Sequence, residues 1–183
     1  MVLEHDFLPT GFRNDIIIKK ERQLIFGTDA GLSVLSNAKT VFMDGTFKVV
    51  GHPFVQLFTL RAFVGTDNRI KQVPLLSVLM SRRRAKDYKL VFKAVRKMMC
   101  VRYKTIVSDY ESAPWRAVRE CFPGGKHLGC YFHWSQAVLR HLRCDEGLQN
   151  AFQSDVAVRK VCKLLFALPF LPADDIVAVF ERI

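Results

Sequence analysis

The sequence predicts a mixed α/β fold, and three observations support this prediction. Short runs rich in β-branched and aromatic residues come first, separated by Asp, Gly and Pro residues that favour turns. After Arg84 the hydrophobic residues recur at the spacing of a helix rather than that of a strand. Further along, two short apolar runs alternate with two helical stretches, an order that predicts parallel strands joined by helices.

The first β-rich runs predict an antiparallel meander of strands. They lie at residues 40–43, 47–50, 55–64 and 73–80. Asp44-Gly45, Gly51-His52-Pro53 and residues 65–68 separate these runs, and we expect them to form tight turns. The meander therefore comes before every helix of the expected core.

Helices and strands alternate after the meander. The first helix is predicted from one apolar face with basic residues beside it, formed by Ala85, Tyr88, Phe92, Val95 and Met99. The remaining elements are expected as a strand at 105–107, a helix at 113–121, a strand at 127–132 and a helix at 134–142. The turn between the last two strands contains Pro123-Gly124-Gly125, which ends the helix before it.

The two ends of the chain carry weaker signals. Residues 147–183 predict helix in two pieces divided by Pro169 and Pro172, and the last piece lacks a capping residue at its end, so we expect a truncated helical insertion. Residues 1–38 predict a short strand at 16–18 and a helix at 20–26. The expected domains are a lead-in of uncertain structure at 1–38, a core at 39–143 and the start of the insertion at 144–183.

The order of the core elements is that of a ribonuclease H-like fold, with a three-stranded antiparallel meander followed by parallel strands and helices. In that fold the fourth strand runs parallel beside the first. Asp44 and Asp109 each follow one of these two β-rich runs, so they are expected to lie close together although 65 residues separate them. Two such carboxylates are suited to binding Mg²⁺ at a phosphodiester. The alternative for each Asp alone is a turn residue after a strand.

The positive charge is concentrated in one segment. The chain has a formal net charge of +11, and residues 69–104 contain twelve Lys or Arg against one acid, Asp87. A patch of this density predicts binding to the phosphates of DNA. The candidate DNA-binding residues are Arg82, Arg83, Arg84, Lys86, Lys89, Lys93, Arg96 and Lys97. The alternative is a solvated helix face that binds nothing.

Composition excludes several classes of protein. No apolar stretch approaches the roughly 18 residues that a membrane span needs, so we expect no membrane partner. The first residues include Glu4, His5 and Asp6, which do not suit a secretory signal. Five irregularly spaced cysteines suit reduced thiols better than a disulfide framework. These observations predict an intracellular protein.

Three local motifs in this order resemble the core of the Mutator-like element (MULE) transposases, over roughly residues 40–143. Asp44 matches the catalytic Asp of the family's DGTF-type motif, and Asp109 matches that of its (S/T)D-x-E-type motif. Cys130 and His133 match the CxxH motif that follows. The resemblance implies a nuclear DDE transposase that cleaves transposon ends and joins them to target DNA. It also implies Mg²⁺ or Mn²⁺ bound by Asp44 and Asp109, and a possible homo-oligomer of the full-length protein.

The sequence departs from the family at the third carboxylate. The family's catalytic Glu follows the CxxH motif after a helical insertion, and neither Glu146 nor Glu181 has the expected surroundings. Glu111 is only two residues from Asp109 and is an auxiliary candidate. We therefore expect this chain alone to be inactive. The alternatives are a non-catalytic DNA-binding or interaction protein derived from such a transposase and, less favoured, a stand-alone nuclease.

The CxxH motif also has the spacing of half a zinc site. Cys130 and His133 would need Cys121 or His127 to complete four ligands. That ligand set is irregular, so the spacing permits structural zinc but does not favour it. Trp115 and Trp134 are expected to pack within helices rather than to stack on bases.

Overall fold

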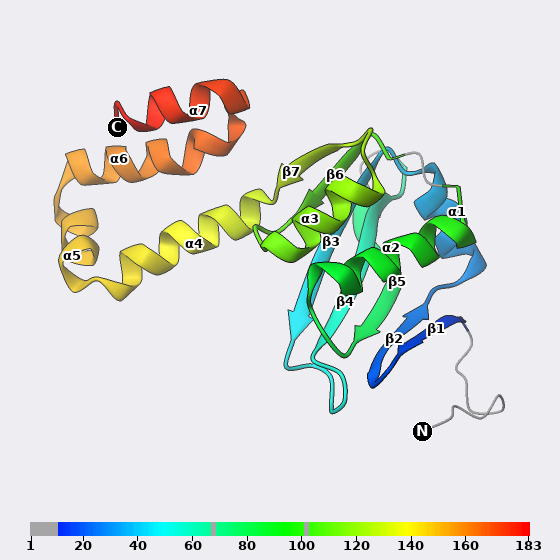
Figure 1. Cartoon of the computed structure of the whole chain (residues 1–183). Coiled ribbons are helices and arrows are strands. Elements are labelled where there is room, and N and C mark those ends of the chain that lie inside the picture. Colours follow the sequence, from blue (N-terminus) through cyan, green and yellow to red (C-terminus); the bar gives the residue numbers. More distant parts are fainter. Residues whose placement is uncertain (1–10, 67–68, 101–102) are drawn as a thin grey trace. The chain divides into compact units, whose positions relative to one another are not determined.

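The structure is a computed structural model, and it describes residues 11–66, 69–100 and 103–183. These residues form seven strands and seven α-helices (Figure 1). In chain order the elements are β1 (Phe12–Ile18), β2 (Glu21–Phe26), α1 (Asp29–Asn37), β3 (Thr40–Phe47), β4 (Gln56–Val64), β5 (Lys71–Met80), α2 (Ala85–Met98), β6 (Thr105–Ser108), α3 (Ser112–Cys121), β7 (Lys126–Gly129), α4 (Tyr131–Cys144), α5 (Glu146–Ser154), α6 (Val156–Ala167), the 3₁₀ helix η2 (Leu168–Phe170) and α7 (Ala173–Phe180). The chain divides into two compact units, Met1–Leu128 and Gly129–Ile183.

One seven-stranded sheet has the order β1-β2-β5-β4-β3-β6-β7. Strands β3, β4 and β5 form the predicted antiparallel meander. Strand β6 lies beside β3 and runs parallel to it, as the sequence predicts for the fourth strand of the core. The mixed α/β class and the parallel pairing of these two strands are therefore confirmed.

The predicted helix at residues 20–26 is wrong, because this segment forms β2. Leu24 and Ile25 of β2 are buried and lie opposite Leu79 and Val78 of β5. Pairing with β5 satisfies the backbone and buries the apolar side chains, and it overrides the weak helical spacing of the segment. With β1, this hairpin adds two strands to the edge of the meander.

The predicted turn at Asp44-Gly45 is also wrong. Strand β3 runs without a break, with Asp44 opposite Thr59 and Gly45 opposite Phe58, and it ends before Lys48, whose φ is 63°. A Cβ on Gly45 would lie 3.0 Å from Oε1 of Gln56, so this glycine permits close packing within the sheet rather than a turn. The second expected strand at 47–50 does not form.

Two expected boundaries near the C-terminal helices also differ. Strand β7 ends at Gly129, and residues 131–132 already belong to α4 rather than to a strand. The tail contains three α-helices instead of two pieces, because Asp145 and Asp155 cap new helices: their Oδ1 atoms accept from the backbone of Leu148 at 3.0 Å and Ala157 at 2.7 Å. None of the helices in the described ranges is long and apolar enough to cross a bilayer.

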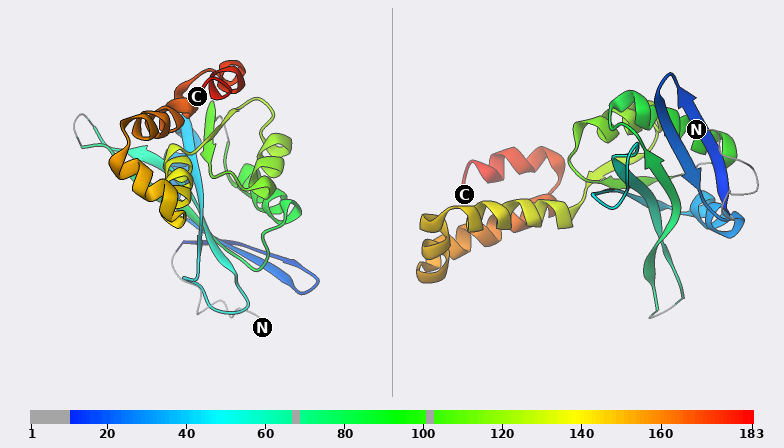
Figure 2. Two further views of the ribbon diagram at one scale, coloured as in Figure 1. Left: turned by 90° about the vertical axis from the view of Figure 1, so that its left-hand side faces the viewer. Right: turned by 90° about the horizontal axis from the view of Figure 1, so that it is seen from below.

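The core of the Met1–Leu128 unit lies between the sheet and the helices α2 and α3, which cover the same face of the strands (Figure 2). The predicted apolar face of α2 supplies Tyr88 and Phe92, both buried. The Phe92 ring lies 6.1 Å from that of Phe58 on β4 and 5.4 Å from that of Phe122 after α3. This aromatic cluster joins the sheet to both helices.

Candidate active site

The register of β3 and β6 sets Asp44 and Asp109 at matching positions. Val41 lies opposite Ile106 and Phe42 opposite Val107, and Asp109 is the first residue after β6. Continuing this register by two residues brings Asp109 level with Asp44. Neighbouring strands are about 4.8 Å apart, so an extension of this register past the end of β6 would bring the two residues close together.

Asp44 lies on the face of β3 opposite to the core. Its neighbours Val41 and Met43 alternate with it and are buried in the core, whereas its carboxylate is 30% exposed. The carboxylate Oδ2 is 3.7 Å from Nη2 of Arg61 on β4, an ion pair at the edge of the distance range. Thr59, directly opposite Asp44, donates its hydroxyl to the Asp44 carbonyl at 3.4 Å.

Asp109 is held by two side chains and one backbone N–H group. Its carbonyl accepts from Oγ of Ser108 at 3.0 Å and from Nε1 of Trp115 on α3 at 2.5 Å. Its carboxylate Oδ1 accepts from the backbone N of Glu111 at 3.3 Å, which fixes the turn between β6 and α3. The backbone and carboxylate of Asp109 are thus both anchored.

His127 on β7 completes this support. Its Nε2 lies 2.8 Å from the Ser108 hydroxyl, and its ring stacks on Trp115 with the centroids 3.8 Å apart. Burial, with a smaller effect of the Arg119 charge, lowers the pKa of His127 from 6.5 to about 4. The imidazole is therefore neutral near pH 7, the form that can either donate to or accept from Ser108.

Lowering the pH from about 7.5 to 5 is expected to destabilise the Met1–Leu128 unit through His127. Because the pKa is lower in the folded state than in the unfolded chain, the contribution is complete above pH 6.5 and is lost as the pH falls toward 4. We expect a loss of about 1 kcal/mol at pH 5 after allowing for the partial exposure of the ring. Urea unfolding at both pH values should show a smaller loss for His127→Gln than for the wild type. Equal losses would contradict this assignment.

Glu111 and Tyr88 lie near the same end of the sheet. Glu111 precedes α3, and its Oε1 is 3.6 Å from Nη1 of Arg83, whose guanidinium also lies 4.5 Å from the centre of the Phe47 ring at the end of β3. Burial raises the pKa of Tyr88 to about 12, with smaller increases from the charges of Glu111 and Asp109. The charges of Glu111 and Asp109 therefore both reach the Tyr88 hydroxyl.

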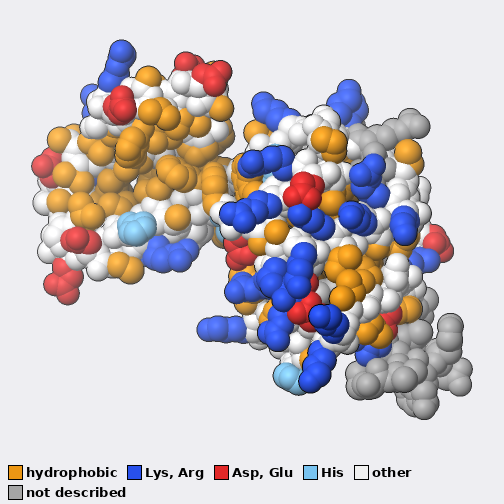
Figure 3. Space-filling view, viewed as in Figure 1, with side chains coloured by type: hydrophobic (Ala, Val, Ile, Leu, Met, Phe, Trp, Pro, Cys, Tyr) orange, Lys and Arg blue, Asp and Glu red, His pale blue; other side chains and the backbone are white. Residues whose placement is uncertain are grey.

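The candidate DNA-binding residues lie on and before α2, where Lys and Arg side chains gather on one face of the Met1–Leu128 unit (Figure 3). Five of the eight have partners within the unit. Arg83 faces Glu111, Arg84 binds Asp87 and Glu21, Lys86 is near Glu21, Lys89 binds Glu120, and Arg96 donates to the Cys121 carbonyl. Within the described residues, Arg82, Lys93 and Lys97 have no carboxylate within 4.0 Å.

A family model for the MULE transposase domain matches residues 40–137, more than half of the chain. The chain belongs to the MULE transposase domain family. The match begins at the first residue of β3 and ends within α4, so it contains Asp44, Asp109, Cys130 and His133. A comparison with curated proteins gave no match.

The CxxH pair of this MULE domain lies at the start of α4. Cys130 immediately precedes the helix, and His133 lies in its first turn. Among the further zinc ligands that we considered, Cys121 is buried with its Sγ 4.0 Å from the Lys89 carbonyl, and His127 is engaged with Ser108 and Trp115. Zinc at Cys130 and His133 gains no support from these contacts.

In the MULE domain, Asp44 and Asp109 supply two carboxylates, and a divalent cation bound by both would need further ligands. The described parts of the chain contain no group of three or more His, Cys, Asp or Glu side chains placed to hold a metal ion. Mg²⁺ is commonly bound by one or two carboxylates with water and substrate phosphates. The Arg61 guanidinium lies 3.7 Å from the Asp44 carboxylate, on the side chain that would bind the metal.

Sequence reasoning missed the residues around the two carboxylates. Thr59, Arg61, Trp115 and His127 reach the site through strand pairing and helix packing. For Thr59 and Arg61, the only sequence signal was their place on the strand expected to pair with β3. The basic residues pair with Glu21, Glu111 and Glu120. These acids lie before or after residues 69–104, so the composition of that segment could not reveal them.

Proposed function

We propose that the chain is a MULE-type DDE transposase domain with a ribonuclease H-like core, acting on the DNA of transposon ends and target. The parallel pairing of β3 with β6 is the observation that carries this proposal, because its register, continued by two residues, leads from Asp109 to Asp44. In this proposal residues 39–143 are the core, residues 1–38 a lead-in and residues 144–183 the start of a helical insertion. The family resemblance supports a nuclear location.

The residues of the site have separate roles in this proposal. Asp44 and Asp109 would hold Mg²⁺ or Mn²⁺, which when bound stabilises charge on phosphate oxygens and activates the attacking hydroxyl. Ser108 and Trp115 keep Asp109 in position through its carbonyl. A fixed carboxylate loses less freedom when it binds its ligand, so these two residues are positioning residues.

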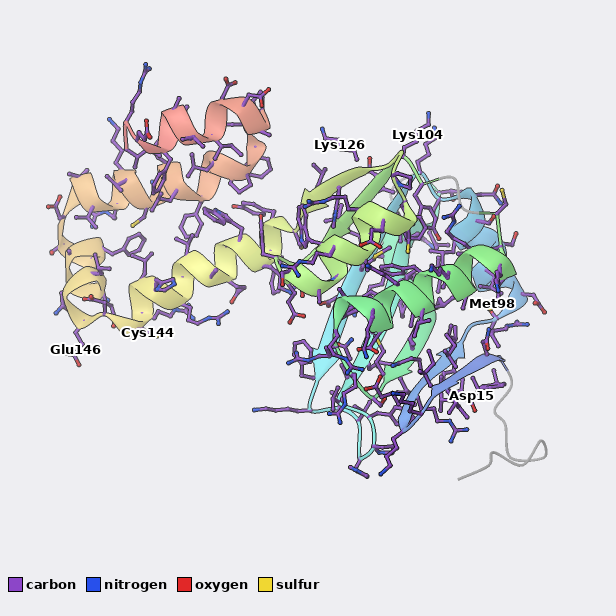
Figure 4. All side chains as sticks on the ribbon, viewed as in Figure 1. Asp15, Met98, Lys104, Lys126, Cys144 and Glu146 are labelled. Atoms are coloured by element: carbon purple, nitrogen blue, oxygen red, sulfur yellow. The ribbon has the colours of Figure 1, made fainter. Side chains whose placement is uncertain are left out.

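The third carboxylate of a DDE site is a separate question. Glu111 lies two residues from Asp109 and is paired with Arg83 at 3.6 Å, so it could join the site only after leaving Arg83. Glu146 lies in the other unit, at the start of α5 beyond the end of α4 (Figure 4). We propose that Asp44 and Asp109 suffice for metal-dependent DNA binding and that strand cleavage requires a further carboxylate.

A second candidate is a non-catalytic DNA-binding protein derived from a transposase. The ion pairs of Asp44 with Arg61 and of Glu111 with Arg83 favour it, because they neutralise carboxylates of the site without a metal. The two candidates differ in one property. A transposase site binds DNA and metal cooperatively, whereas binding through surface cations alone is weakened by divalent salt.

Metal-dependent DNA affinity distinguishes them. Binding of a labelled duplex, followed by fluorescence anisotropy at constant ionic strength with and without Ca²⁺, should be several-fold tighter with Ca²⁺ for the wild type. The variants Asp44→Asn and Asp109→Asn should lose this gain. The control Asp29→Asn, at a side chain 92% exposed on α1 and paired with Arg13, should keep it. An identical response to Ca²⁺ in all four proteins would support the second candidate.

A further inference from the structure

Arg61 reaches Asp44 across the strand pair β3–β4. Arg61 lies opposite Phe42, and Asp44 lies opposite Thr59, so Arg61 and Asp44 are diagonal neighbours on one face of the sheet. Diagonal partners are within reach of a long side chain. The register of β4 against β5 shifts between Leu60 and Arg61, and such irregularities commonly redirect a side chain next to a functional site.

Thr59 connects the two residues. Its Oγ1 accepts from Nε of Arg61 at 3.0 Å and donates to the carbonyl of Asp44 at 3.4 Å. This arrangement holds Arg61 by Nε and leaves the outer part of the guanidinium directed toward the carboxylate. Within the described part of the chain, Nη1 of Arg61 has no hydrogen-bond partner.

The contact between Arg61 and Asp44 is a loose one. Their closest atoms, Nη2 and Oδ2, are 3.7 Å apart, and the two side chains are 31% and 30% exposed. The ion pair of Arg22 with Asp15 in the β1–β2 hairpin is different, because Nε and Nη2 both donate to the carboxylate at 2.5–3.1 Å. The first pair is therefore easier to separate than the second.

We propose that Arg61 is a phosphate-binding residue that serves as the counter-ion of Asp44 when DNA is absent. Before Asp44 can act as a metal ligand, the guanidinium has to move away, and a DNA phosphate beside the site offers it a planar, bidentate partner. Arg61 would thus couple metal binding to DNA binding. This inference rests on the proposed function, since it takes Asp44 as a metal ligand.

Two binding assays with the full chain test the inference. Mn²⁺ titration without DNA, followed by water proton relaxation, should show about three- to tenfold tighter binding for Arg61→Gln than for the wild type, because a nearby positive charge is removed. Duplex DNA in Ca²⁺ should bind this variant about three- to tenfold more weakly, because one phosphate contact is lost. A variant that merely misfolds would lose both affinities.

Two further variants sharpen the test. Arg61→Lys keeps the charge, so its Mn²⁺ affinity should stay near that of the wild type. Arg69→Gln removes an exposed arginine from the β4–β5 connection and should change the Mn²⁺ affinity little. If Arg61→Gln leaves either the Mn²⁺ affinity or the DNA affinity unchanged, the inference about Arg61 is wrong and the proposed function is unaffected. If Asp44→Asn does not weaken Mn²⁺ binding, both the inference and the proposed function are wrong.

Discussion

Replacing Arg82, Lys93 and Lys97 together by Gln is expected to weaken duplex DNA binding by about 10- to 100-fold near 0.1 M salt. Within the described residues these three have no carboxylate partner, so their charges are available to phosphates. The slope of log K against log salt should become shallower by up to about 0.9 for each lost phosphate contact. Arg84 is left intact because its guanidinium binds Asp87, whose carboxylate also accepts from the Arg84 backbone N at 2.9 Å at the start of α2.

A matched variant separates this effect from the loss of net charge. Arg140, Lys160 and Lys163 are exposed residues of the Gly129–Ile183 unit, and their replacement by Gln also removes three charges. We expect this second variant to keep most of the salt dependence of the wild type. Similar slopes for the first variant and the wild type would show that Arg82, Lys93 and Lys97 are solvated and do not contact DNA phosphates.

Phe92→Ala is expected to lower the free energy of unfolding of the Met1–Leu128 unit by about 3–5 kcal/mol. The side chain is 0% exposed, and its ring contacts aromatic rings from β4, α2 and the segment after α3. Its removal leaves a cavity between the sheet and both helices, which the surrounding rings cannot fill without leaving their packed positions. Since domains are stable by only about 5–15 kcal/mol, much of the stability would be lost.

The measurement is urea unfolding followed by the fluorescence of Trp115. A Trp134→Phe background makes Trp115 the only tryptophan of the chain. The control is Phe63→Ala, at a ring 56% exposed whose aromatic contact is Phe42 at 5.1 Å. We expect the control to cost about 1 kcal/mol or less. Equal losses in the two variants would mean that the aromatic cluster does not dominate the packing.

The central part of the fold could be predicted because its local signals agree with its tertiary packing. The spacing of Tyr88 and Phe92 predicts a helix, and both residues are buried against the sheet. The segment at residues 21–26 shows the opposite case. Its strand exists through pairing with β5, which a weak local pattern did not reveal. The same holds for Asp44-Gly45, where the composition of a turn occurs inside a paired strand.

The candidate site could be predicted only as far as its two carboxylates. Asp109 follows a short β-rich run, and both Asp44 and Asp109 fall in motifs that resemble those of the family. Arg61 and His127 depend on which strands are neighbours, so no local pattern could have assigned them. The partners of the basic residues were missed for the same reason: Glu21 and Glu120 come from β2 and α3.

The position of bound Mn²⁺ tests most directly whether Asp44 and Asp109 form one metal site. Paramagnetic broadening of backbone amide signals should be strongest at residues 43–46 and 108–111, weak at β1, and abolished by Asp44→Asn. Both segments should broaden together at the same Mn²⁺ concentration, because residues 43–46 belong to β3 and residues 108–111 begin at the last residue of the adjacent strand β6. Broadening centred elsewhere, such as at Glu146 on α5, with residues 43–46 and 108–111 unaffected, would contradict a metal site at these two carboxylates.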